Sequence, residues 1–174
     1  MTEIDHTEFE TRIEVRQMRL EDFDQIVALQ RRCFPHMKPW QREHIASHLE
    51  VFREGQLVLE LDGRVVGSCS SLVIDFDEYE EGHTWMEVAG GGYIHNHDPA
   101  GDTLYGIEIM VDPEFRGMKL ARRLYDARKQ LCRERNLKRI VVGGRLPGYG
   151  SHADRMSVRE YVDRVLRRDV FDPV

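Results

Sequence analysis

The residues from Ile109 to Ala121 have the types and the order needed to bind a phosphate group. An apolar strand reaches Val111, Asp112-Pro113 closes it, and Gly117 allows a tight turn before a helix begins. The first N–H groups of a helix have no partner within the helix and lie at the positive end of its dipole. We therefore expect the turn to bind a phosphate or pyrophosphate.

The charges around this turn support the same expectation. Acidic side chains are normally preferred in the first turns of a helix, but here basic residues occupy them. These residues are Arg116, Lys119, Arg122 and Arg123. Such an arrangement suits a ligand that brings negative charge, and the alternative is a solvated basic helix face without a ligand.

The elements that position this turn are predicted from hydrophobic periodicity. Strands are expected at 13–18, 56–61, 64–74, 104–111 and 139–143, and helices at 20–34, 41–52, 119–135 and 157–168. Asp62-Gly63 predicts a tight hairpin, and 75–103 is expected to be a long loop. A hairpin followed by a strand–helix–strand unit indicates an α/β (α+β) fold, with helices packed on a mixed sheet.

Composition excludes several classes of protein. The 174 residues are 41% apolar and 32% charged, which is typical of one soluble domain. The net charge of −6 argues against non-specific nucleic-acid binding, and no apolar run is long enough for a membrane span. Residues 1–12 lack the pattern of a secretory signal and are expected to form a flexible tail.

The cysteines and histidines point to neither a disulfide framework nor a metal site. Three widely spaced cysteines fit a reducing compartment, so we expect a cytoplasmic protein with Cys69 and Cys132 in its core. His95 and His97 lie in a stretch rich in turn residues, and no metal is expected there.

The turn resembles a known family signature. Arg116-x-x-Lys119-x-Ala121, after Ile109-x-Val111-x-Pro113, is similar to the acetyl-coenzyme A motif Gln/Arg-x-x-Gly-x-Gly/Ala of the GNAT N-acetyltransferases. The first and last positions match, and Lys119 replaces the usual glycine. The resemblance implies a GNAT-like, mostly antiparallel sheet flanked by helices over 13–174, and acetyl-CoA as cosubstrate.

A closer resemblance is to a bacterial subfamily in which a GNAT domain precedes a carbon–nitrogen hydrolase (nitrilase-like) domain. Residues 92–99, 104–111 and 123–129 carry this likeness. The family's C-terminal strands and its usual tyrosine general acid are expected to be missing, so the domain is interpreted as C-terminally truncated. An exposed sheet edge would favour association, including a homodimer.

The resemblance also assigns roles to residues near the turn. The backbone of Met110 and Val111 is expected to pair with the pantetheine arm of the coenzyme. The pyrophosphate is expected to lie on the backbone N–H groups from Gly117 to Ala121, beside Arg116. Those N–H groups belong to Gly117, Met118, Lys119, Leu120 and Ala121.

Acetyl transfer to an amine needs a base, and the family usually places it on the strand before the signature turn. Glu108 and Tyr105 are the candidates, and Glu108 is favoured. They lie on opposite faces if that strand is regular, whereas a bulge would change this. The alternative for Glu108 is a salt-bridged or solvated strand carboxylate.

The function expected from these residues is acetylation of an unidentified primary amine, carried by a small molecule or a peptide. The alternative is a non-catalytic coenzyme A-binding or regulatory module that acts with a partner or fused hydrolase.

Overall fold

The computed structural model describes residues 13–172, and the tail expected at 1–12 lies outside these residues. The chain divides into two compact units between Val142 and Gly143. Each unit is described by itself. Within residues 13–172, no helix combines the length and the apolar character needed to cross a membrane.

The first unit is built on a mixed five-stranded sheet with the order β1-β2-β3-β4-β5. Neighbouring strands from β1 to β4 are antiparallel to each other, and β5 runs parallel to β4. This confirms the mostly antiparallel sheet that was predicted. The strands are β1 (Ile13–Gln17), β2 (Gln56–Leu61), β3 (Arg64–Ile74), β4 (Thr103–Val111) and β5 (Arg139–Val142).

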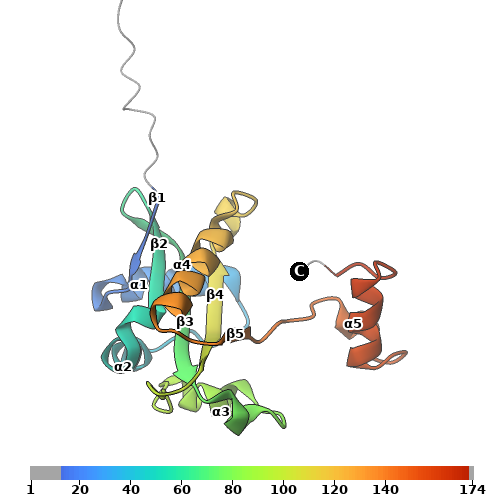
Figure 1. Cartoon of the computed structure of the whole chain (residues 1–174). Helices are drawn as coiled ribbons and strands as arrows, with labels where there is room; N and C mark the ends of the chain where they lie inside the picture. The colour runs from blue at the N-terminus through green and yellow to red at the C-terminus, as the bar shows by residue number, and fades with distance from the viewer. Residues whose placement is uncertain (1–12, 173–174) are drawn as a thin grey trace, which may run out of the picture. The chain divides into compact units, whose positions relative to one another are not determined.

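Helices cover both faces of this sheet. They are α1 (Phe23–Cys33), α2 (Arg42–Phe52), the short α3 (Trp85–Val88) and α4 (Leu120–Glu134). Figure 1 shows α4 in front of the strands and α1 behind them. Met110 packs with Ile26 of α1, whereas Cys69 packs with Leu124 of α4. The sheet is therefore the middle layer between α4 on one side and α1 and α2 on the other.

Local sequence explains most of these elements. Asp62 and Gly63 have φ angles of 49° and 82°, as the hairpin prediction required. The 75–103 segment, expected to be a loop, contains α3, which begins at a capping box. The Thr84 hydroxyl accepts a bond from the Glu87 N–H, and the Glu87 carboxylate accepts one from the Thr84 N–H.

The second unit contains α5 (Val158–Leu166). Its N-cap is Ser157, whose hydroxyl accepts a bond from the Glu160 N–H at 3.3 Å. The buried Tyr161 donates its hydroxyl to Asp172 at 2.6 Å. That carboxylate raises the pKa of Tyr161 to about 12.

Candidate active site

The signature turn joins η6 (Pro113–Phe115) to the N-terminus of α4. Lys119 is the N-cap of α4 and makes no side-chain capping bond, and the first turn of the helix holds no acidic residue. Leu120 is only 2% exposed and anchors the helix on the sheet, while Met118 is 54% exposed. The turn is thus fixed from inside while its outer side faces solvent.

The backbone of the turn keeps the conformation that glycine would favour. Gly117 has a φ of 84°, and Lys119 has φ 59° and ψ 23°, in the left-handed region. A non-glycine residue in this region costs about 1–2 kcal/mol. Lys119 therefore preserves the path of the turn, although it stands where the family has glycine.

Asp112 connects the end of β4 to α1 and β3. Its fully buried carboxylate accepts bonds from Arg32 at 2.9 Å and Arg64 at 2.8 Å, and from the Glu114 N–H at 3.1 Å. Burial raises the pKa of Asp112, but the Glu114 N–H and the two guanidinium groups lower it more, so it lies below its usual range. From the sequence, Asp112 was identified only as a residue that ends a strand, and its buried ion pairs were not predicted.

One edge of β4 is open beside the turn. The strand β5 pairs with β4 only from Thr103 to Gly106. Among the described residues, the part of β4 from Ile107 to Val111 pairs with no strand on that side. Met110 and Val111, expected to pair with the pantetheine arm, lie in this open part.

A bulge brings the two candidate bases to one face of β4. Ser70 pairs with Glu108 and Ser71 with Gly106, so Ile107 has no partner on β3. Glu108 therefore lies opposite Ser70, and Tyr105 opposite Leu72, which is two residues further along β3. Because residues i and i+2 share a face, Glu108 and Tyr105 lie on one face, which is the change that a bulge was expected to bring.

Glu108 is a partly buried carboxylate with a shifted pKa. The Ser68 hydroxyl lies 3.1 and 3.2 Å from its two carboxylate oxygens. Burial raises the pKa of Glu108 to about 7, although Arg128 and the Ser68 hydroxyl oppose this rise. A carboxyl with this pKa exchanges protons near neutral pH, as a general base must.

Tyr105 is more enclosed than Glu108. Its side chain is 4% exposed and its hydroxyl lies 3.0 Å from His83 Nε2. His83 Nδ1 lies 3.0 Å from the Tyr79 carbonyl, which can only accept, so Nδ1 donates to it. Burial raises the pKa of Tyr105. The hydroxyl is thus held by a partner within the protein.

Two residues that contact the bulge were missed by the sequence. Arg128 of α4 is 1% exposed, although a basic residue of an amphipathic helix usually faces solvent. Its spacing of four residues from Leu124 was a signal for the buried side of α4. On the other side, the Trp85 indole donates to the Ile107 carbonyl at 2.9 Å.

The histidines of the 83–97 segment have structural contacts of their own. His97 Nδ1 accepts the Val73 N–H at 3.0 Å, and its ring stacks on Phe52. His95 stacks on Tyr93. In the part of the chain that the structure describes, no group of three His, Cys, Asp or Glu side chains is placed to hold a metal ion.

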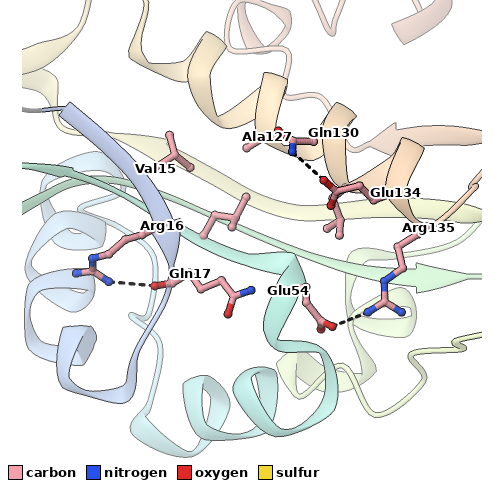
Figure 2. A pocket seen from close by; sticks show the side chains of 10 residues that line it. Val15, Arg16, Gln17, Glu54, Ala127, Gln130, Glu134 and Arg135 are labelled. Carbon is pink, nitrogen blue, oxygen red and sulfur yellow. Dashed lines mark hydrogen bonds and ion pairs between the residues drawn. The ribbon is translucent and has the colours of Figure 1, made fainter.

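One groove on the first unit lies away from the signature turn. It has a volume of about 470 Å³ and lies between β1 and the C-terminal half of α4. Figure 2 shows Gln130 bonded to Glu134, and Arg135 bonded to Glu54, on its walls. These polar groups bind one another, and the groove includes none of the predicted site residues.

Comparison with known proteins shows the family to which this chain is similar. A model described as "Acetyltransferase (GNAT) family" matches residues 23–153. "Probable hydrolase YhcX" of Bacillus subtilis (strain 168) is 52% identical over 98% of this chain and 33% of its own length. The chain thus spans about a third of that relative.

Two further proteins are similar over most of their length. "Uncharacterized N-acetyltransferase YkwB" of the same organism is 34% identical over 92% of this chain and 73% of its own. The solved structure of the "GphF GNAT-like decarboxylase in complex with isobutyryl-CoA" has a TM-score of 0.69 and 25% identity, covering 92% of this chain and 80% of that one.

Proposed function

Because this chain belongs to the acetyltransferase (GNAT) family, we propose that it transfers an acetyl group from acetyl-CoA to a primary amine of a small molecule or peptide. The observation that carries the proposal is the open edge of β4 from Ile107 to Val111, which leads to the uncapped N-terminus of α4. An extended, phosphate-bearing cosubstrate fits this combination.

In this proposal the coenzyme follows the strand and then the turn. Its pantetheine arm pairs with the backbone of Met110 and Val111. Its pyrophosphate accepts bonds from the N–H groups between Gly117 and Ala121. The side chains of Arg116 and Lys119, both exposed, add positive charge around the phosphates. The complex of the GphF relative with isobutyryl-CoA supports an acyl-CoA as cosubstrate.

Glu108 is proposed as the general base. Its carboxylate takes a proton from the ammonium group of the acceptor, and the freed nitrogen lone pair attacks the thioester carbonyl carbon. A C–N bond forms, the C–S bond breaks, and the leaving thiolate takes the second proton from nitrogen. Tyr105 lies on the same face, but its hydroxyl is bonded to His83, so Glu108 remains the favoured candidate.

The hydrolase activity in the name of YhcX is not part of this proposal. The matched region covers only 33% of that protein.

Calorimetric titration with acetyl-CoA tests the coenzyme site. We expect micromolar binding, and R116A is expected to weaken it about tenfold through loss of a charged contact. R133A, which alters an exposed arginine of the same helix, is the matched control. Absence of binding by a folded wild-type sample would overturn the coenzyme site.

Turnover tests the transfer step. Release of free coenzyme A thiol is followed with acetyl-CoA and with isobutyryl-CoA, each against a panel of small primary amines and peptides. Amine-dependent thiol release is expected, fastest with acetyl-CoA. Binding without thiol release for any amine would indicate the non-catalytic module instead.

A further inference from the structure

The bulge in β4 needs partners for its backbone. A bulge interrupts the ladder of hydrogen bonds, and buried carbonyl groups beside it must be satisfied in another way. Arg128 Nη2 donates to the Ser70 carbonyl at 2.8 Å and to the Glu108 carbonyl at 2.5 Å. Its Nε donates to the Ser71 hydroxyl at 3.0 Å. One guanidinium group thus joins β3 and β4 at the register shift.

The strand leaves room for this guanidinium group. A Cβ atom on Gly106 would lie 3.0 Å from Arg128 Cζ and 2.8 Å from Val142 Cγ1, which is closer than side chains normally approach. Any larger residue at position 106 would therefore push the guanidinium group away from the two carbonyls. Gly106 and Arg128 form a matched pair beside the bulge.

Arg128 is a costly choice for this position if packing were its only role. It is 1% exposed and lies near the apolar residues of α4 such as Leu124 and Leu131. A buried charge is tolerated only when it is well hydrogen-bonded, and an apolar side chain of similar size often stabilises a core better. The charge of Arg128 and its several N–H donors therefore indicate that its role is to hold the geometry of the bulge.

We propose that Arg128 is a positioning residue that fixes the β4 bulge and so keeps the Glu108 carboxylate on the same face as Tyr105. This inference rests on the proposed role of Glu108 as the base. Without the bulge, the two-residue period of the strand would place Glu108 and Tyr105 on opposite faces.

The charge of Arg128 also acts on Glu108. Other titratable groups near this carboxyl are the thiols of Cys33 on α1 and Cys69 on β3. Burial raises the pKa of both thiols, so they stay neutral near pH 7. Ser68 contributes a hydroxyl but no charge. Arg128 is thus the charged neighbour that favours the ionised form of Glu108.

The test compares the full-length wild-type chain with R128M, R128K and R133M. The Glu108 carboxyl is titrated by NMR after labelling glutamate with ¹³C, and E108Q identifies its signal. Hydrogen exchange of the backbone amides from Gly106 to Ile109 reports the state of the bulge. R133M removes an exposed arginine from the same helix and is the matched control.

In R128M, loss of the positive charge is expected to raise the midpoint of Glu108 by about one pH unit from its value near 7. Exchange of the bulge amides is expected to rise at least about tenfold, because the carbonyls lose their shared donor. R133M is expected to match the wild type in both measurements. A folded R128M with unchanged midpoint and unchanged exchange would overturn the proposal.

If R128M does not fold, R128K is the variant that tests the proposal. Its ammonium group keeps the charge but not the planar fork, so the midpoint of Glu108 is expected to stay near the wild-type value while the bulge amides exchange faster. Unchanged exchange in R128K would contradict the positioning role. Neither NMR titration nor exchange depends on turnover, so failure of the transferase proposal would be recognised separately by absence of thiol release.

Discussion

Burial and charge act in opposite directions on Glu108. Burial raises its pKa, Arg128 and Ser68 lower it, and the balance is a pKa of about 7. A carboxylate with the ordinary value would hold a proton too weakly to accept one readily from an ammonium group. Partial burial thus gives this residue the basicity that the proposed acetyl transfer needs.

Replacing Glu108 with Gln is expected to lower kcat about 100-fold, because the amide cannot accept the proton of the acceptor. In the wild type, kcat/KM should rise with pH and level off above the pKa of about 7. The measurement is thiol release across pH with the best amine acceptor. E134Q, on the exposed face of α4, is the control, and equal rates for E108Q and wild type would rule out this role.

The same substitution, E108Q, is expected to stabilise the folded protein at high pH although it lowers kcat. The folded-state pKa of Glu108 is about 7 against an ordinary value of 4.5, so between these pH values the unfolded chain releases a proton that the folded chain keeps. Wild-type stability therefore falls as pH rises through this window. E108Q lacks this loss and should be more stable by about 1–3 kcal/mol at about pH 8, but not at about pH 4.

Urea unfolding at the two pH values measures this difference. An equal effect of E108Q at both would mean that the substitution acts through packing rather than through the charge of Glu108. The residue would then be an ordinary strand carboxylate.

At the scale of elements, the turn before α4 depends on the backbone of Lys119. Its φ of 59° is strained for lysine and free for glycine. We expect K119G to keep or raise the free energy of unfolding by up to about 1 kcal/mol. K119V should lower it by about 1–2 kcal/mol, since a branched side chain fits this region poorly.

Chemical unfolding of both variants beside the wild type checks this prediction. Equal losses in the two would show that the lysine side chain, rather than the backbone angle, sets the stability of the turn.

Elements with a clear hydrophobic period could be predicted, whereas features that depend on distant contacts could not. Asp62-Gly63 specified the β2–β3 hairpin through local φ angles. Thr84 and Glu87 form a capping box that was present in the sequence but was not used to predict α3. The bulge at Ile107 requires Arg128, twenty-one positions further along the chain, and no local pattern marks such a contact.

In the candidate site, too, local features could be predicted and features that depend on distant contacts could not. The path of the turn from Arg116 to Ala121 was predicted because a glycine turn before a helix is a local feature, and anion binding there stays a prediction. Whether Tyr105 and Glu108 share a face was left to the presence of a bulge, because the face of each residue depends on the register with β3. Arg128 was missed because a basic residue in an amphipathic helix is usually solvated.

At the scale of the whole molecule, the residues of the candidate site belong to the first unit, which has its own core. Its three hydrophobic clusters contain buried residues from both faces of the sheet. Leu72, Leu104 and Leu124 are completely inaccessible to solvent. The first unit thus contains the packing that holds β4, the turn and α4 in place.

The second unit has much less of its own packing. Among the described residues 143–172, only Tyr161 and Asp172 are buried, and they bond to each other. Leu166 is 76% exposed and Phe171 84% exposed. A segment of about this size rarely buries enough apolar surface to be stable by itself.

Native-state hydrogen exchange should therefore separate the two units. Amides in β3, β4 and α4 are expected to exchange only with global unfolding, because they lie on the three core clusters. Amides of α5 are expected to exchange at least about 100-fold faster, because few buried contacts oppose local opening. The comparison is made by NMR on one sample, with the α5 amides near Tyr161 measured against those near Leu124. Equal protection would show that α5 is stabilised by contacts beyond the Tyr161–Asp172 pair.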